Sequence, residues 1–500
     1  MRRKRIEVHS EIEPSGSATP SVTNAKTSVV GTADGQIANS YVEALVGPSA
    51  WSNAAPITYH LAYSDWNNNG IDDWNEDGAG DAIRLALELW SHVADVTFVE
   101  VATPGQANLV EYIDNADGYL GWHEYPGGWG NQSEGHFNQD GTGWDSLGLG
   151  QGGYGFITLV HELGHGLGLE HPHDGDRFPG VSWAGDYGAY RLNQGIYTTM
   201  SYLDGWDQLP SPSDNYGWQG GPMAFDIAAI QQIYGRNTTF ASGNDSYELP
   251  DGNGSGTFFI AIWDTGGTDE IVYSGSRDTT IDLTAATIDR SPTGGGVVSA
   301  ANGVYGGYTI AQGVWIENAS GGTGSDRITG NARANQLNGN GGSDLLIGMG
   351  GNDVLDGGGE GDWLSGGFGI DRLIGGLGND FLIGGRGGDV LIGGEDADRF
   401  DFNNIRDSRR ADVDFISDFT VGEDLIDLRG IDADVDRRGN QNFRFMGDDA
   451  LTTRGHQVHF VHDTVNNRTI IEGDVTGDRR VDFKIVLDGL HDLTGYDFIL

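Results

Sequence analysis

Apolar residues at helical spacing predict a helix over residues 156–167. Its apolar positions are Phe156, Leu159, Val160, Leu163 and Leu167. Upstream, the same spacing predicts helices over 38–45 and 81–93, and strand-like patterns cover 57–63, 96–101 and 107–113. A further helix is expected within 221–235, with Pro222 near its start and Gly235 at its end. This order of helices and strands predicts an α+β domain.

The second half of the chain follows a different pattern, a nine-residue repeat from Gly321 to Asp401. Each unit has a glycine-rich half and a short strand whose apolar residue would point inwards. These apolar residues are Ile328, Leu337, Leu346, Leu355, Leu364, Leu373, Leu382, Leu391 and Phe400. Two units would make one coil of a parallel roll, so odd and even units would form two facing sheets with strands about 4.8 Å apart. The second half is therefore predicted to be an all-β parallel roll.

An acid recurs at the sixth position of nearly every unit, and Asn335 fills the remaining slot. These acids are Asp326, Asp344, Asp353, Asp362, Asp371, Asp380, Asp389 and Asp398. Stacked turns would bring carboxylates of successive coils together, where they repel each other unless a cation lies between them. Calcium prefers such carboxylate and carbonyl oxygens. Folding of the roll is therefore expected to require several structural calcium ions.

Composition sets further bounds on class and domain organisation. The net charge is −45, which disfavours binding to nucleic acid and to anionic membranes, and the chain contains no cysteine. No apolar run is long enough to span a membrane, and the basic start lacks the apolar stretch of a secretory signal. We expect a disordered leader or pro-segment over 1–35, an α+β domain over 36–240 and the roll domain over 241–500.

The predicted helix over 156–167 opens the stretch that reads H-E-L-G-H-G-L-G-L-E-H. His161 and His165 would leave the same face of the helix, and a glycine turn at Gly168 would let His171 return to them. Three imidazole ligands with one open position are typical of a catalytic zinc site. Glu162 stands where it can take a proton from a zinc-bound water.

This stretch resembles the signature of metzincin metalloproteases, and Pro172 after the third histidine is similar to the serralysin branch. The resemblance implies a zinc endopeptidase in which Met200 forms the turn beneath the metal. It also implies that Tyr202 is a further zinc ligand, which on release hydrogen-bonds the oxyanion, and that Glu162 passes its proton to the leaving amine. Extracellular proteins and peptides would be the substrates.

The repeat region is identified as the repeats-in-toxin nonapeptide, and the flanking segments also resemble serralysins. By this resemblance Asp264, Asp269 and Glu317 are calcium ligands before the roll, and residues 418–428 begin a capping β-sandwich. Asn244 replaces an acid that the family commonly has. The last residues, Asp497 to Leu500, resemble the signal read by ABC-type (type I) exporters. This resemblance implies a secreted, extracellular bacterial protein. We also expect the protein to be a monomer.

Several assignments stay open in the sequence. Residues 65–76 fit the spacing of an EF-hand calcium loop, but Ile71 stands one position early and no helix is expected before the loop. Asp474 to Asp478 is either a cation loop or an ordinary turn. His456, His459 and His462 suggest a metal cluster, but alternation along a strand favours structural roles. A peptide substrate would pair with an edge strand at 107–113 or at 119–124.

Two other functions remain compatible with these patterns. A calcium-dependent surface or adhesion protein with an inactive protease domain would keep the repeats. A metalloenzyme that acts on a bond other than the peptide bond would keep His161, Glu162, His165 and His171.

Overall fold

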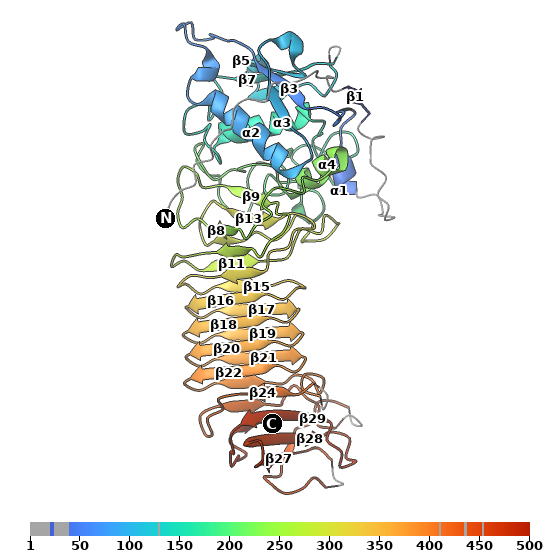
Figure 1. Ribbon diagram of the computed structural model, residues 1–500, viewed down its shortest axis with the longest axis vertical. Coiled ribbons are helices and arrows are strands. Elements are labelled where there is room, and N and C mark those ends of the chain that lie inside the picture. Colours follow the sequence, from blue (N-terminus) through green and yellow to red (C-terminus); the bar gives the residue numbers. More distant parts are fainter. Residues whose placement is uncertain (1–20, 25–39, 129–130, 410–411, 435–437, 453–454) are drawn as a thin grey trace.

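The computed structural model describes residues 21–24, 40–128, 131–409, 412–434, 438–452 and 455–500. Figure 1 shows an elongated molecule with most of its helices and a small sheet at one end, a stack of short strands in the middle, and further strands at the other end. The α+β domain and the all-β domain that the sequence predicts are both confirmed.

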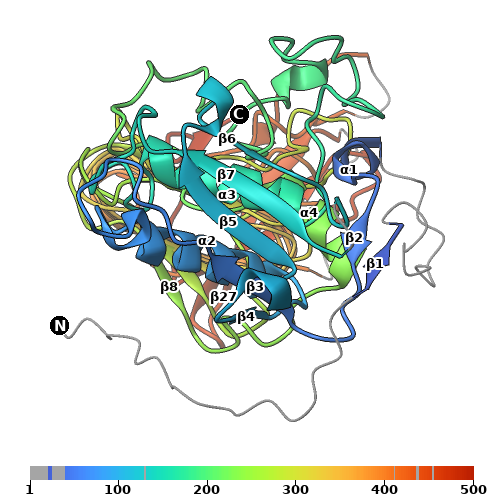
Figure 2. The ribbon, with the colours of Figure 1, turned by 90° about the horizontal axis from the view of Figure 1, so that it is seen from above.

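The α+β end is a sheet covered by helices. Its helices are α1 (Ser40–Leu45), α2 (Ala79–Val93), α3 (Tyr154–Gly166) and α4 (Ala224–Tyr234), with short 3₁₀ turns at η1 (Asp73–Asn75), η2 (Pro104–Gln106), η3 (Ala116–Gly118) and η4 (Ala189–Arg191). The sheet has the spatial order β4 (Phe98–Glu100), β3 (Ile57–Leu61), β5 (Leu109–Asp114), β7 (Ser133–Asn138) and β6 (Gly121–His123). Only β6 runs antiparallel to its neighbour among these strands. Helices α2 and α3 pack beneath this sheet in both views (Figures 1 and 2).

The predicted apolar face of α3 forms the centre of this end. Phe156, Leu159, Val160 and Leu163 are fully buried, and the indole nitrogen of Trp90 on α2 donates to the Val160 carbonyl at 3.2 Å. Helix α2 begins at Ala79, earlier than predicted, after Gly78 in the left-handed region and without a side-chain cap. The acidic residues before α2 therefore do not cap it through a side chain.

The predicted leader is ordered at one place. Val22–Thr23 forms β1, which pairs antiparallel with β2 (Ala50–Trp51). Val22 also packs close to Gly127, where an added Cβ would lie 2.9 Å from a Val22 methyl group. Backbone pairing with the buried strand β2 positions this segment, although its own sequence has no helical or strand-like pattern. Residues 1–20 and 25–35 lie outside the described part of the chain.

The roll consists of two mostly parallel sheets that share a core. One sheet has the order β26 (Arg444–Phe445), β27 (Gln457–Asp463), β28 (Arg468–Asp474), β29 (Phe483–Asp488), β24 (Asp414–Ile416), β22 (Val390–Glu395), β20 (Arg372–Leu377), β18 (Val354–Gly359), β16 (Gln336–Gly341), β14 (Asn318–Ser320), β10 (Glu270–Val272) and β8 (Ser246–Glu248). The other has the order β12 (Ala300–Ala301), β11 (Thr279–Asp282), β15 (Arg327–Thr329), β17 (Leu345–Gly350), β19 (Trp363–Phe368), β21 (Phe381–Arg386), β23 (Arg399–Asp401), β25 (Leu425–Asp427) and β30 (Phe498–Ile499). Between the α+β end and the roll, β9 (Phe259–Ile262) pairs with β13 (Gly307–Ile310).

The register of these sheets confirms the predicted coil of two units. Leu346 pairs with Leu364, and Leu355 pairs with Leu373, so partners lie eighteen residues apart. All nine apolar repeat residues are fully buried. Strands β16 to β22 are six residues long, because the ladder continues through the glycine-rich half to pairs such as Met349 with Gly367.

The C-terminal strands continue both sheets beyond the repeats. Strand β24 pairs parallel with β22 and β29, and β25 pairs with β23 and β30. The capping strands therefore extend the roll itself. Among the described residues, no helix is both long and apolar enough to cross a membrane.

Replacing a core leucine of the roll tests this packing. Leu364 is fully buried, so Leu364→Ala is expected to lower the free energy of unfolding by about 2–5 kcal/mol through lost burial and a residual cavity. Leu377→Ala on β20 is the matched control, because that leucine is 54% exposed. Urea unfolding of the calcium-loaded chain, followed by circular dichroism, measures both, and equal losses would contradict the shared core.

Candidate active site

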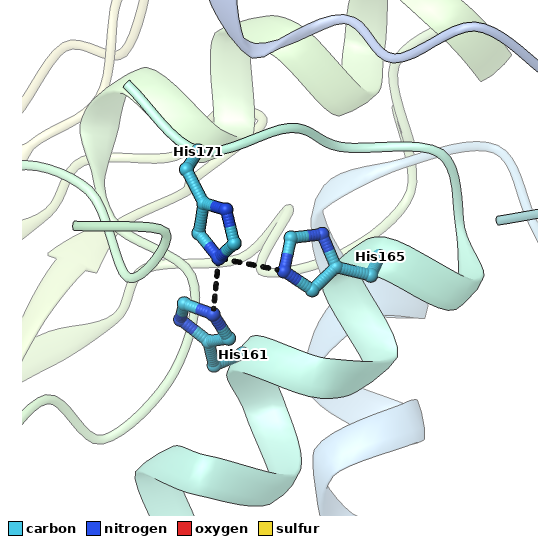
Figure 3. A group of neighbouring side chains, drawn as sticks. All are labelled: His161, His165 and His171. Carbon is cyan, nitrogen blue, oxygen red and sulfur yellow. Dashed lines mark hydrogen bonds between the residues drawn. The ribbon is translucent and has the colours of Figure 1, made fainter. Parts of the chain in front are cut away.

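Three imidazole nitrogens converge beside helix α3. Its last turns carry His161 and His165, and Gly168 at φ 101° turns the chain so that His171 returns to them. The Nε2 atom of His171 lies 3.2 Å from Nε2 of His161 and 2.9 Å from Nε2 of His165 (Figure 3). The structure thus brings together the three histidines that the sequence selects.

Each of the three rings is held through its other nitrogen. Nδ1 of His161 lies 2.7 Å from the Thr199 carbonyl, Nδ1 of His165 lies 2.7 Å from the Leu169 carbonyl, and Nδ1 of His171 lies 2.7 Å from a carboxylate oxygen of Asp174. Oxygen atoms of this kind only accept, so every Nδ1 carries a proton and donates it.

The three Nε2 atoms consequently face one another as lone pairs. Burial lowers the pKa of His161 to about 4 and that of His171 to about 2, and it lowers the pKa of His165 well below its ordinary value. Neutral rings with converging lone pairs require a cation between them, and this donor set fits zinc.

The carboxyl group of Glu162 lies on the same helix and is almost fully buried. Burial raises the pKa of Glu162 to about 8, although His123 opposes the shift. Glu162, His161 and Tyr202 help to line a cleft of about 420 Å³. A carboxyl group that binds a proton this strongly, in a cleft beside three metal-binding nitrogens, has the properties of a proton carrier.

One wall of this cleft is an edge strand. Tyr119, Leu120 and Gly121 line the cleft, and β6 ends the sheet beyond β7. Strand β5, in contrast, lies in the interior between β3 and β7. Of the two strands that the sequence offered for substrate pairing, 107–113 is therefore wrong, because both its edges are already paired.

Met200 lies directly beneath the helix. It is fully buried, and a Cβ on Gly164 would lie 2.7 Å from its sulfur, so only glycine allows this close approach. The turn that carries Met200 is tied to α4, because buried Asp226 accepts from Thr199 N–H at 2.7 Å and from Met223 N–H at 2.9 Å. The sequence did not single out Asp226, since nothing local marks an acid inside an apolar helix as an anchor.

Tyr202 stands at the mouth of the cleft. Its ring centre is 4.4 Å from that of His171 and 5.9 Å from that of His161, and its side chain is half exposed. Burial raises the pKa of Tyr202 to about 12, so its hydroxyl is a donor at neutral pH.

A buried histidine–glutamate pair that was not predicted lies behind the cleft. Nε2 of His123 is 3.2 Å from Oε1 of Glu111, and both side chains are fully buried. Burial opposes the charge of His123, but Glu111 nevertheless raises the pKa of that imidazole above its ordinary value. The two residues come from β5 and β6, and no local sequence pattern links them.

The repeat aspartates form the predicted column in the roll. Oδ1 of each accepts from the backbone N–H of the residue one coil earlier, as when Asp362 accepts from Asp344 at 2.8 Å. Oδ2 is buried and, within the described residues, accepts no hydrogen bond in Asp344, Asp353, Asp362, Asp371, Asp380, Asp389 and Asp398. A Cβ on Gly339 would lie 2.2 Å from Oδ2 of Asp344 and 2.6 Å from the Gly357 carbonyl oxygen. Aspartate oxygens without a donor and turn carbonyl oxygens therefore lie close together at these turns, as a calcium site requires.

Two predicted positions differ from this rule, and one position that was not predicted follows it. Asp326 has both oxygens occupied, since Thr279 N–H donates to Oδ1 and Gly322 N–H donates to Oδ2, each at 2.7 Å. Asn335 donates from its amide to the Glu317 carbonyl at 2.9 Å. Asp414 continues the column, with Oδ2 buried and without a hydrogen-bond partner in the described chain, but its spacing from Asp389 breaks the period and hides it in the sequence.

Before the roll, the structure brings Asp264 and Asp269 together with Asp245. Their carboxylate oxygens lie within 4.8 Å of one another, and Glu317 accepts from Asp269 N–H at 3.1 Å. The sequence instead drew attention to Asn244, whose side chain accepts from Thr268 N–H at 3.0 Å. Asp245, the residue directly after Asn244, completes this cluster.

The three C-terminal histidines and the turn at Asp474, which the sequence left open, make structural contacts. His456 lies against the Ala433 carbonyl at 2.6 Å, His459 against Glu472 at 3.3 Å and His462 against the His491 carbonyl at 2.9 Å, so the three rings have separate partners. Asp474 accepts from the N–H groups of Gly477 and Arg479, which is the pattern of an ordinary turn.

The fold and the histidine site together define a metzincin-type protease domain followed by a β-roll domain. A family model described as "Peptidase M10 serralysin C terminal" matches residues 224–500, and one described as "Matrixin" matches residues 50–179. The chain belongs to the serralysin family of M10 peptidases.

Curated relatives agree with this assignment. Serralysin B of Dickeya chrysanthemi is 32% identical over 49% of this chain and 51% of its own length. Metallopeptidase AprA of Pseudomonas marginalis is 31% identical over 53% of this chain and 57% of its own length. The chain spans about half the length of the curated relatives it matches. A solved structure titled "Structure of myroilysin" covers 38% of this chain at 17% identity with a TM-score of 0.24, too low to establish a shared overall fold.

Removing the anchor of the methionine turn tests its structural role. Asp226→Ala leaves two backbone N–H groups and the Thr198 hydroxyl without their buried acceptor, so we expect a loss of about 3 kcal/mol in unfolding free energy. Chemical denaturation monitored by tryptophan fluorescence measures this loss. Asp81→Ala, at an aspartate whose side chain is 95% exposed, should cost less than about 1 kcal/mol. A loss at Asp226 no larger than that of the control would contradict the anchor.

Proposed function

We propose that this chain is a zinc-dependent endopeptidase that hydrolyses proteins and peptides. The observation that carries the proposal is the convergence of three unprotonated Nε2 atoms beside buried Glu162, in a cleft bordered by an edge strand. His161, His165 and His171 would hold the zinc ion, and Asp174 would orient His171. When bound, zinc supplies Lewis-acid activation of water and of the scissile carbonyl.

The chain's own residues would move the proton. Glu162, as its carboxylate, takes a proton from the attacking water and delivers it to the leaving amine. Tyr202, with its hydroxyl protonated at the cleft mouth, can donate to the oxygen on which negative charge develops. The resemblance alone assigns Tyr202 as a zinc ligand, and its ring centre lies 4.4 Å from that of His171.

Strand β6 would align the substrate. One side of β6 pairs with β7, and Gly121 on β6 lines the cleft, so an extended peptide can add to the sheet along this edge. Main-chain pairing of this kind fixes the peptide without reading its side chains. It would place a peptide bond across the cleft next to Glu162.

We also propose that the roll binds several calcium ions and folds on binding them. The support is the column of buried Oδ2 atoms without donors, next to turn carbonyl oxygens. Asp264, Asp269, Glu317 and the newly found Asp245 would hold another ion before the roll. Asp326 is a weaker ligand than the sequence suggested, because donors already occupy both its oxygens.

Secretion through a type I exporter is part of the same proposal. Asp497 is buried and accepts from Gly422 N–H at 2.8 Å, and Phe498 is also buried. A signal in residues 497–500 would therefore be accessible only while this end is unfolded. A calcium-poor cytosol would keep it so, and folding would follow outside the cell.

Glu162→Gln tests the mechanism. The substitution keeps the three histidines and removes the proton carrier, so casein cleavage should fall by about 10²–10⁴-fold while zinc content stays unchanged. Cleavage is measured by fluorescent casein release and zinc by elemental analysis. The control Glu43→Gln, at an exposed residue of α1, should keep full activity.

The outcomes separate the rival functions. Undiminished cleavage by Glu162→Gln would reject the proposed mechanism. A wild-type chain that binds zinc but cleaves neither casein nor a peptide library would instead favour the adhesion protein or a metalloenzyme with another substrate.

The pH dependence of the calcium-free roll tests the column. Burial raises the pKa of Asp344, Asp362 and Asp398 to about 7, so the folded state holds protons that the unfolded chain has released. The stabilisation is complete below the ordinary aspartate value and is lost as the pH rises through about 7. In EDTA, protonated carboxyl groups should therefore allow the roll to fold at about pH 5, and the midpoint of thermal unfolding of its β structure should fall with rising pH until the calcium-free roll is unfolded at about pH 8.

The calcium-loaded chain serves as the control in that experiment. Calcium binds the ionised carboxylates, so its presence should abolish or reverse the fall. A calcium-free midpoint that rises with pH over the same window would contradict the proposed column.

A further inference from the structure

A loop over residues 65–76 lies in the α+β domain, apart from both the histidine site and the roll. It connects β3 to the start of α2, and residues 1, 3, 5, 9 and 12 of the loop carry oxygen atoms in their side chains. These residues are Asp65, Asn67, Asn69, Asp73 and Glu76, and Gly70 stands at the sixth position. This spacing is that of a twelve-residue calcium loop.

The backbone of the loop turns as such a loop must. Gly70 has φ 84°, and its N–H donates to both carboxylate oxygens of Asp65 at 3.2 and 3.1 Å. Oδ1 of Asn69 accepts from Ile71 N–H at 2.7 Å. The side-chain amides of Asn67 and Asn69 both approach the Glu76 carboxylate, so residues 3, 5 and 12 of the loop meet.

Two buried oxygens without donors in the described segments, one within the loop and one beside it, also point to a ligand. Asp73 is only 1% exposed; its Oδ2 accepts from Trp66 N–H of the loop at 2.8 Å, while its Oδ1 accepts nothing in the described part of the chain. Oε1 of Gln139 is likewise buried and unpaired among the described residues, and Nε2 of the same amide lies 3.5 Å from Glu76. Buried acceptors without donors are costly, and a cation satisfies them.

We propose that this loop binds one calcium ion. Asp65, Asn67, Asn69, Asp73 and Glu76 supply side-chain oxygens, and the seventh residue supplies its carbonyl oxygen, as in other loops of this length. Three carboxylates more than offset the two positive charges of the ion, and an all-oxygen donor set without histidine or cysteine favours calcium over zinc.

Two departures from the paired EF-hand have local explanations. Strand β3 precedes the loop in place of a helix, and Ile71 is 49% exposed, so the loop is not paired with a second one through an apolar residue. Trp74 anchors it instead, since its indole nitrogen donates to the Ala62 carbonyl at 3.1 Å and its ring packs on Phe137. The oxygens of the three acids are not all within 4.8 Å of one another, so binding would draw Glu76 inwards.

An ion at this position would join three elements of the α+β domain. The loop leads into α2, Ser64 Oγ donates to the Ile113 carbonyl on β5 at 2.6 Å, and Gln139 follows directly after β7. Helix α2 in turn contacts the zinc-site helix through Trp90. Calcium here would stabilise the α+β domain independently of calcium in the roll.

Calcium counting on the full-length chain tests the proposal. Native mass spectrometry of the calcium-saturated protein should show one calcium ion fewer per chain in Glu76→Gln than in the wild type. The matched control Asp81→Asn removes one negative charge from the exposed first turn of α2 and should keep the wild-type count. A wild-type count in a folded Glu76→Gln would overturn the proposal.

A second measurement needs no variant. Hydrogen exchange on the wild-type chain, followed during calcium titration, should show slower exchange in peptides that cover residues 65–76 once calcium binds. Exchange in this loop that is unchanged from EDTA to saturating calcium would overturn the proposal, even if Glu76→Gln fails to fold.

Discussion

Electron pairs that face each other without a proton between them are the constraint on which this molecule depends. At the histidine site, oxygen acceptors hold all three Nδ1 protons, so the Nε2 lone pairs of His161, His165 and His171 meet unshielded. In the roll, one oxygen of each column aspartate is committed to a backbone N–H and the other faces turn carbonyls. Both arrangements are unfavourable in a buried, weakly screening interior unless a positive charge is present. In both places, hydrogen bonds within the chain occupy the other nitrogen or oxygen atom of each side chain, which leaves the remaining lone pair to face a positive charge.

The parts predicted from sequence are those that short-range spacing determines. The histidines of α3 lie one turn apart, Gly168 supplies the positive φ that brings back His171, and the nine-residue period sets both the core leucines and the acids. In each case the residues that meet are linked by a fixed number of positions along the chain. Periodicity then translates directly into geometry.

The parts that could not be predicted depend on contacts between distant segments. Asp226 contacts the turn that it anchors directly, although the two are 27 residues apart in sequence, and Asp414 joins the column only because β24 replaces a repeat strand. The choice of β6 over β5 as the free edge needed the strand order of the whole sheet. Likewise, Val22–Thr23 is ordered only because β2 offers it a partner.

The hydrogen bonds that the aspartate side chains make between coils of the roll all run in one direction. Each aspartate accepts from the N–H of the residue one coil nearer the N-terminus, and the last two donors, at Asp389 and Asp398, depend on Asp414 and Asp424 outside the repeats. Interior coils are thus interchangeable, whereas the terminating strands are not. Evolution could lengthen or shorten the stack by whole turns of eighteen residues, but every such variant would need the same closing piece to complete its final turn.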